Sequence, residues 1–185
     1  MYEDLSYVLH SRSATAIEAI SEVELRPWIT EYQVGSSIDF SSGGAARDYT
    51  VNGWGHAEDW GTWIVGTEAE IHLPLTNALG GGAVLSMEVA PYLNSLHPTL
   101  HATVLYRGTI VGQWSFDRSG FVSLSSDIPA DLISGDSNPR FTFQIPDARS
   151  PSATGQSTDS RLLGLGFKSL RFDRLPLALP SPSDG

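Results

Sequence analysis

The segment Leu100-His-Ala-Thr-Val-Leu-Tyr-Arg-Gly-Thr-Ile-Val-Gly-Gln-Trp114 decides the fold class, because it joins two strand-like runs through a tight turn. Leu100–Tyr106 and Thr109–Trp114 are β-branched runs of strand length, which is typical of β-strands. The connection Tyr106-Arg-Gly-Thr109 leaves two central residues, the length of a tight hairpin turn. The segment therefore predicts an antiparallel pair of strands.

Similar short runs continue on both sides of this hairpin, separated by turn residues. Ala69–Leu75 and Val84–Ala90 alternate between apolar and polar residues, as half-buried strands do. Asp127–Leu132 is expected to form one helical turn. Eight or nine strands at a spacing of roughly ten residues predict an all-β fold, a two-sheet antiparallel β-sandwich of jelly-roll type. The other expected strands are Tyr32–Val34, Ser37–Phe40, Gly120–Leu124, Arg140–Ile145 and Leu163–Phe172.

A helix is expected only near the start of the chain. Residues 11–26 have an apolar face, Thr15 and Glu18 have the spacing of a capping box, and Pro27 would end the helix. A strand over Val23–Trp28 is the rival interpretation. The expected organisation is a helical N-terminal extension (1–28), a β-sandwich domain (29–174) and a proline-containing disordered tail (175–185).

The composition excludes several classes of protein. The absence of cysteine excludes disulfides, thiolate nucleophiles and Cys-ligated zinc. A net charge of −10 argues against nucleic-acid binding, which requires a cationic face. No apolar run approaches the roughly 20 residues that a membrane-spanning helix needs. No secretion signal is visible, which predicts a cytoplasmic location if Met1 is the native start.

The densest chemical feature is Gly53-Trp-Gly-His-Ala-Glu-Asp-Trp-Gly-Thr-Trp63, which we call the Trp segment. Indole faces can stack on the C–H faces of sugar rings, and neighbouring carboxylates can accept hydrogen bonds from hydroxyls. We therefore expect Trp54, Glu58, Trp60 and Trp63 to face a ligand. The alternative is that Trp60 and Trp63 close one end of the sandwich while Glu58 caps a loop.

A second polar stretch follows the Arg140–Ile145 strand and contains two aspartates and two arginines. Asp147 and Asp159 could form fork-shaped ion pairs with Arg149 and Arg161 that fix the loop. They could also belong to a ligand site, or supply oxygen ligands to a structural Ca²⁺. Fixing the loop is favoured, because the stretch lacks the closely spaced acids of a calcium-binding loop.

No catalytic motif emerges from the sequence. Nucleophile elbows, phosphate-binding loops and dinucleotide fingerprints are all missing. Glu58 or Asp59 could pair with Asp147 or Asp159 as the two carboxylates of a glycosidase, although the sequence does not give their separation. His97 and His101 have the spacing of zinc ligands only in a helix, which Pro98 opposes. We expect no metal centre there.

The order of motifs resembles a known domain family. The stretch Gly35–Phe40, the Trp segment, Phe143-x-Ile-Pro-Asp-Ala-x-Ser-Pro151 and Leu163-Gly-Leu165 are similar to an uncharacterised β-rich domain. That domain occurs C-terminal to bacterial membrane glycosyltransferases and phosphoglycerol-transferase-like enzymes of surface-polysaccharide assembly. The resemblance spans about residues 32 to 174 and implies a jelly-roll accessory module that contacts carbohydrate. Gly55 and the pair His56-Ala57 depart from the family pattern. If the loop binds a ligand, these departures bear on which ligand it would select.

Three functions are compatible with these observations. The leading hypothesis is a non-catalytic module that binds or positions a glycan in bacterial surface-polysaccharide metabolism, through the Trp segment and, secondarily, Asp147, Asp159 and Arg161. The second is a structural or interaction domain that docks on a glycosyltransferase through aromatic residues such as Trp28 and Trp114. The third is a polysaccharide-cleaving enzyme. The expected partners are a glycan or polysaccharide and, in the second hypothesis, a glycosyltransferase. Neither a nucleic acid nor a membrane span is expected, and no cofactor is expected beyond the Ca²⁺ mentioned above.

Overall fold

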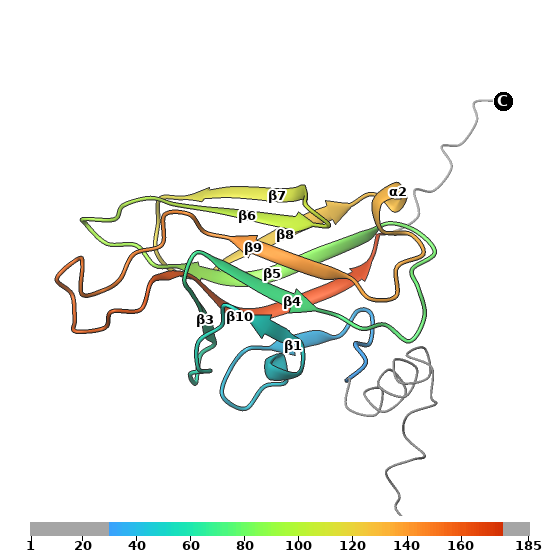
Figure 1. Cartoon of the computed structure of the whole chain (residues 1–185), viewed down its shortest axis with the longest axis horizontal. Coiled ribbons are helices and arrows are strands. Elements are labelled where there is room, and N and C mark those ends of the chain that lie inside the picture. Colours follow the sequence, from blue (N-terminus) through green and yellow to red (C-terminus); the bar gives the residue numbers. More distant parts are fainter. Residues whose placement is uncertain (1–29, 176–185) are drawn as a thin grey trace, which may run out of the picture. The chain divides into compact units, whose positions relative to one another are not determined.

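The computed structural model describes residues 30–175, which form a β-sandwich of two five-stranded antiparallel sheets (Figure 1). The predicted two-sheet antiparallel fold of jelly-roll type is confirmed. The predicted helix over 11–26 and all but the first residue of the predicted tail lie outside the described residues. Within residues 30–175, no helix has the length and apolar character needed to cross a membrane.

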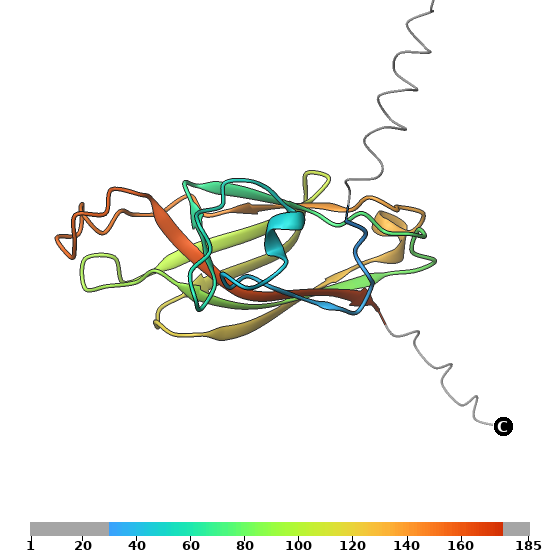
Figure 2. The same ribbon diagram turned by 90° about the horizontal axis from the view of Figure 1, so that it is seen from below.

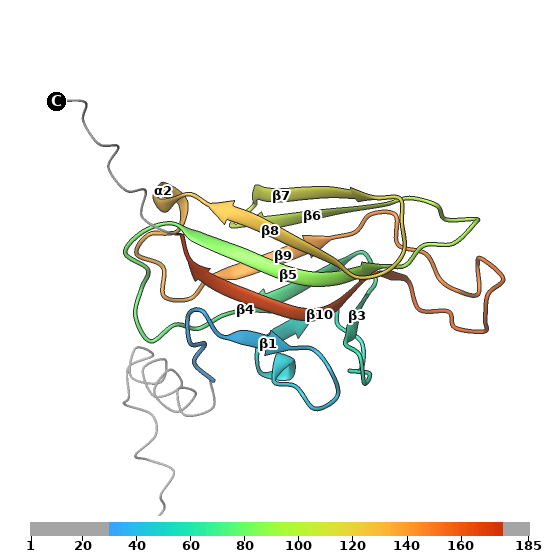
Figure 3. The same ribbon diagram turned by 180° about the vertical axis from the view of Figure 1, so that it is seen from behind.

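We call the two layers sheet A and sheet B. Figure 3 shows sheet A in front, with the order β1-β10-β5-β8, and β3 also pairs with β10. Sheet B has the order β2-β4-β9-β6-β7, and Figure 2 shows β4 and β9 on the opposite side of the sandwich from β1 and β10. The strands of sheet A are β1 (Ser37–Asp39), β3 (Thr62–Val65), β5 (Ala83–Pro91), β8 (Val122–Ile128) and β10 (Leu163–Arg174). Those of sheet B are β2 (Thr50–Asn52), β4 (Glu68–His72), β6 (Leu100–Tyr106), β7 (Thr109–Phe116) and β9 (Arg140–Gln144).

The core lies between the sheets and follows the two-residue period of the strands. In β5, Leu85 and Met87 are buried, whereas Ser86 and Glu88 point to the other face and are half-buried. Large rings from both sheets meet in this layer. The most deeply buried of them are Tyr32, Phe40, Tyr106, Phe141, Phe143, Phe167 and Phe172. Because one face of β5, β6 and β9 is buried along the strand, the register of these strands is strongly specified.

The hairpin between β6 and β7 has the predicted turn. Arg107 and Gly108 occupy its two central positions with φ angles of 50° and 78°. Positive φ at both positions defines a type I′ turn, whose twist matches that of the flanking strands. The predicted antiparallel pairing of Leu100–Tyr106 with the following strand is confirmed.

Several local predictions were wrong. The sheets contain ten strands rather than eight or nine, because β2 and β3 were not predicted. The helical turn is α2 (Ala130–Ile133), later than the predicted Asp127–Leu132, because Asp127 and Ile128 still belong to β8. Tyr32–Val34 is not a strand. There the Tyr32 hydroxyl accepts a 2.9 Å hydrogen bond from the N–H of Phe172, and the Tyr32 N–H donates to the carbonyl of Pro74, so isolated hydrogen bonds rather than a strand ladder fix the segment.

We expect the substitution Leu85→Ala to lower the free energy of unfolding by about 2–5 kcal/mol, because it leaves a cavity between the sheets. Val84→Ala, on the outward and half-buried face of the same strand, should cost about 1 kcal/mol or less. Urea denaturation of both variants measures the difference. Equal losses for the two variants would contradict the assigned register of β5.

Candidate functional site

The Trp segment leads from β2 into β3 and folds back on itself. The N–H of Glu58 donates to the carbonyl of Gly61 at 2.8 Å, which closes a hairpin. Gly53 begins the segment with a φ of 76°, and a Cβ at this position would lie 2.0 Å from the carbonyl oxygen of Glu68. Only glycine fits this backbone position. The hairpin sends the three Trp side chains to two different surfaces.

Trp54 packs into the core. Its ring centroid lies 5.1 Å from those of Phe40 and Phe167, and 6.0 Å from that of Phe143. Its indole N–H donates to the carbonyl of Glu70 at 2.8 Å, so the polar end of the ring is satisfied. Trp54 therefore anchors the Trp segment to the sandwich. Its side chain is half-buried, and the part that stays exposed borders a pocket.

Trp60 and Trp63 lie on the outer face of sheet A. Trp63 is the register partner of Gly166 in β10, and Gly166 is in turn the partner of Ala90 in β5. A Cβ on Gly166 would lie 2.5 Å from Cη2 of Trp60 and 3.0 Å from Cε3 of Trp63. Because Gly166 has no side chain, both rings can lie directly on the sheet at this position.

Phe121, directly before β8, extends these two rings into an aromatic strip. Ring centroids are separated by 5.1 Å between Trp60 and Trp63, and by 5.9 Å between Trp60 and Phe121. Phe121 is 50% exposed, and the two Trp side chains are partly exposed. The indole N–H of Trp60 donates to the Glu58 carboxylate at 2.9 Å, which fixes its orientation. Trp60, Trp63 and Phe121 are called the aromatic strip below.

Two polar rows cross sheet A beside the aromatic strip. Each row consists of outward side chains that are register partners on neighbouring strands. The serine hydroxyls in them form no side-chain hydrogen bond with any described residue, and a shallow hollow of about 550 Å³ lies over them. We call them the serine rows. One comprises Ser37, Arg171, Ser86 and Ser125, and the other Ser169, Glu88 and Ser123.

Asp159 and Arg161 form the fork-shaped pair that the sequence predicted. Arg161 Nε donates to both carboxylate oxygens at 3.0 and 3.1 Å, and a terminal guanidinium nitrogen donates at 2.7 Å. These hydrogen bonds lower the pKa of Asp159 and raise that of Arg161. The negative charge of Glu58 also raises the pKa of Arg161, which places the pair beside the Trp segment.

Asp147 instead has His101 in β6 as its partner. Its carboxylate accepts hydrogen bonds from the backbone N–H of His101 at 3.1 and 3.2 Å and lies 2.8 Å from the ring Nδ1. Burial raises the pKa of Asp147, but the hydrogen bonds from His101 outweigh burial and hold the pKa below its ordinary value. Arg149 forms a backbone bridge with Leu163, and its side chain is not the partner of Asp147.

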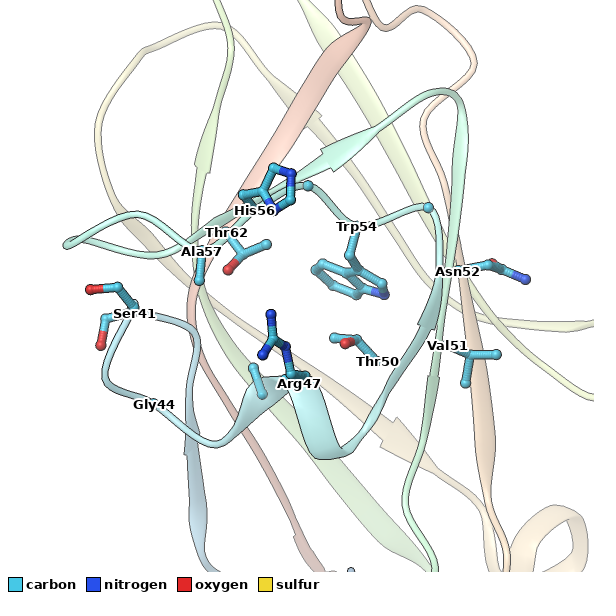
Figure 4. Close-up of a pocket in the computed structure, with 14 residues that line it drawn as sticks. Ser41, Gly44, Arg47, Thr50, Val51, Asn52, Trp54, His56, Ala57 and Thr62 are labelled. Carbon is cyan, nitrogen blue, oxygen red and sulfur yellow. The ribbon is translucent and has the colours of Figure 1, made fainter. Parts of the chain in front are cut away.

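A pocket of about 410 Å³ lies on the other side of the Trp segment, next to the short 3₁₀ helix η3 (Ala46–Asp48). Figure 4 shows the Trp54 ring on one side of this pocket and Arg47 reaching into it from η3. His56 and Thr62 lie across from them. The Trp segment therefore borders two surfaces, the aromatic strip and this pocket.

The structure brings most of the predicted site residues together. Trp54, Glu58, Trp60 and Trp63 share the hairpin, and Arg161 lies beside it, since its Nη1 is 3.7 Å from where a Cβ of Gly55 would be. Asp159 joins through Arg161, while Asp147 holds a different strand. Sequence reasoning missed Phe121, the serine rows and Arg47. The signal for the strip was the second glycine of Leu163-Gly-Leu-Gly-Phe167, because Gly166 replaces an outward side chain beneath the rings.

Trp114, proposed for docking on an enzyme, is only half-exposed and packs against the core. Trp28 lies outside the described residues. Within residues 30–175, no group of three or more His, Cys, Asp or Glu side chains is arranged to hold a metal ion. His97 is buried in a loop, and His101 is committed to Asp147.

No family model matches the chain, and no curated protein matches it. A family 115 4-O-methyl-α-glucuronidase with specificity for decorated arabinogalactans is similar in structure, with a TM-score of 0.50 and 8% identity. The similarity covers 80% of this chain and 18% of that enzyme, and it supports the β-sandwich fold.

Two carbohydrate-binding modules also have similar structures. The C-terminal family 6 module of a laminarinase from Zobellia galactanivorans has 12% identity and a TM-score of 0.45, over 75% of this chain and 98% of the module. A family 36 module in complex with calcium and xylotriose has 12% identity and a TM-score of 0.43, over 75% of this chain and 99% of the module.

We expect Asp147→Asn to lower the free energy of unfolding by about 1 kcal/mol at neutral pH, because the charged acceptor of His101 is lost. A carboxyl with a lowered folded-state pKa stabilises above its unfolded pKa of about 4 and loses this effect as the pH falls through the folded pKa. Denaturation of wild type and variant from pH 7 to pH 2 should show the two curves converging in acid.

Asp117→Asn is the matched control for this experiment, because the Asp117 side chain is 80% exposed. It should leave the stability unchanged at each pH. A difference between wild type and Asp147→Asn that persists below pH 3, or none at pH 7, would contradict the assigned role.

Proposed function

We propose that this chain is a non-catalytic carbohydrate-binding module that holds a saccharide on the outer face of sheet A. One observation carries the proposal: the aromatic strip adjoins two rows of serine hydroxyls that have no partner among the described residues. An apolar platform next to unpaired donors and acceptors matches a sugar ring, which has flat C–H faces and a rim of hydroxyls.

The two parts of this surface supply different contributions. Contact with a C–H face removes apolar ring surface of Trp60 and Phe121 from water. Each serine hydroxyl can donate one hydrogen bond and accept others. Because the serines stand on paired strands, they are held at fixed spacings before a ligand arrives, which lowers the entropy lost on binding.

Binding is favoured over cleavage by the state of the carboxylates. A general acid in a glycosidase needs a raised pKa so that it stays protonated near neutral pH. The pKa values of Asp147 and Asp159 are both lowered, by hydrogen bonds from His101 and Arg161. Glu58 accepts a hydrogen bond from Trp60, and Asp59 accepts one from Ser42. Asp147 and Asp159 are therefore held as hydrogen-bond acceptors rather than as proton donors.

The biological setting is proposed from the sequence resemblance described above. A module that holds a glycan would act in bacterial surface-polysaccharide metabolism, beside a glycosyltransferase or a related enzyme. Structural Ca²⁺ stays a prediction for this chain. The two aspartates considered as its ligands are engaged by His101 and Arg161, whereas Ca²⁺ requires six to eight oxygen ligands. Ca²⁺ binding would be detected as a change in melting temperature on adding CaCl₂ or EDTA.

The test is titration of the full chain with neutral and acidic bacterial polysaccharides, followed by Trp fluorescence. We expect binding to change the emission, because Trp60 and Trp63 lie in the strip. Phe121→Ala should weaken binding about tenfold through lost ring contact. Ile110→Ala is the matched control, since Ile110 is 54% exposed on β7 of sheet B. Its affinity should equal that of the wild type.

Two results would contradict the proposal. One is the absence of binding to every polysaccharide tested, combined with capture of a glycosyltransferase in a pull-down, which would favour the docking function. The other is equal affinity in the Phe121→Ala and Ile110→Ala variants, which would remove the strip as the site.

The absence of catalysis is tested separately. Purified protein incubated with each polysaccharide should release no new reducing or unsaturated ends, because the pKa values of Asp147 and Asp159 are lowered, whereas a general acid needs a raised one. Release that is lost in Glu58→Gln or Asp59→Asn would instead identify a cleaving enzyme.

A further inference from the structure

We propose that the pocket around Arg47 binds the carboxylate of an acidic saccharide, a uronic acid residue. This pocket lies beside η3 and β2, away from the serine rows of sheet A, and constitutes a second site. The inference extends the proposed function, and the experiment below separates the failure of one from the failure of the other.

Arg47 is a cation without a counter-ion in the described structure. No carboxylate oxygen of residues 30–175 lies within 4.0 Å of its guanidinium, although the chain has twenty-one acidic residues. Figure 4 shows its guanidinium directed toward the space between Trp54, Thr62 and His56. The arginines of the described chain that do form ion pairs are Arg107, Arg118, Arg140, Arg161 and Arg171.

The charge of the pocket lining is opposite in sign to the net charge of the protein. Among the described residues that line it, the ionisable side chains are Arg47 and His56, and no Asp or Glu is present. The whole chain carries a net charge of −10. A local cationic pocket within an acidic protein attracts an anion to this place and repels it elsewhere. The neighbouring acids do not line the pocket themselves: Asp48 lies on η3, and Asp39 and Asp59 accept hydrogen bonds from the lining serines Ser41 and Ser42.

The remaining walls match a sugar ring. Trp54 presents part of its ring, which the core contacts with Phe40 and Phe167 hold rigidly. Thr50 and Thr62 place hydroxyls beside the guanidinium, and the Thr62 hydroxyl donates to the carbonyl of Phe40 at 2.6 Å, which leaves its oxygen free to accept. A volume of about 410 Å³ is within the roughly 300–1,000 Å³ range of small-ligand sites.

A carboxylate suits this site better than a more highly charged group. Its two coplanar oxygens match the fork of one guanidinium. It carries a single negative charge, which the single guanidinium of Arg47 balances, whereas a phosphate dianion would leave one negative charge unbalanced in an acidic protein. In a uronic acid the carboxylate is attached directly to the ring, so it can contact Arg47 while ring C–H groups face Trp54.

The test compares two ligands that differ only at carbon 6: methyl β-D-glucuronide with a carboxylate and methyl β-D-glucoside with a hydroxymethyl group. Binding to the full chain is followed by NMR through the backbone amides of Gly53 and Gly55, which border the pocket. We expect the glucuronide to bind about tenfold more tightly. Arg47→Gln should abolish the preference, and Arg47→Lys should retain only part of it, because the fork is lost.

Arg118→Gln is the charge-matched control, because the Arg118 side chain is 92% exposed and lines neither surface. It should keep the full preference, as should Phe121→Ala. Equal affinity for the two ligands in the wild type, or a preference that survives Arg47→Gln, would overturn the assignment. Tighter binding of the 6-sulfate of methyl β-D-glucoside than of the glucuronide would assign the pocket to sulfated sugars instead.

The two proposals fail in different ways. If neutral polysaccharides bind in a Phe121-dependent manner but no carboxylate preference exists, the strip remains and the Arg47 site is refuted. If the glucuronide binds through Arg47 but Phe121→Ala changes no polysaccharide affinity, the pocket remains and the strip is refuted.

Discussion

The structure depends on the register of β10. This strand pairs with β1 and β3 on one side and with β5 on the other, so three strands take their position from it. Its inward side chains include Phe167 and Phe172, which are fully buried among rings from both sheets. A slip of one residue would exchange the two faces of the strand and expose these rings. The buried rings thus fix which residues of β10 face outward.

The outward face of β10 determines what the surface can do. Gly166 leaves room for Trp60 and Trp63, and a bulge between Phe167 and Ser169 interrupts the simple alternation. After the bulge, Ser169 meets its row partner Glu88, and Arg171 meets Ser86. The same strand therefore creates the apolar strip and both polar rows. The register of β10 therefore determines both the core packing and the candidate binding surface.

The sequence predicted the parts of this structure that local patterns encode. Val84–Ala90 and Leu100–Tyr106 could be recognised because one side of each strand is buried along its whole length. Strands β2 and β3 have three and four residues, too few for a periodic pattern. The Trp segment was found by composition, but its hairpin separates Trp54 from the other two rings, and composition does not encode that separation.

The serine rows and the surroundings of Arg47 could not be predicted, for a different reason. A row joins residues such as Ser37, Ser86 and Ser125, which become neighbours only through strand pairing. Arg47 lines a pocket whose described lining contains no carboxylate, and this depends on which segments meet in space rather than on the local sequence. Asp159 and Arg161, in contrast, are two residues apart and their pairing was predicted.

The order of strands also constrains how the chain can fold. β10 is the last strand of the described chain, yet it lies between β1 and β5, and Ser37 pairs with Arg171. Sheet A therefore cannot assemble during synthesis until β10 has left the ribosome, and its earlier strands wait with unpaired edges. Such long-range pairing has a high contact order, so we expect slow folding that is exposed to competing edge-to-edge association.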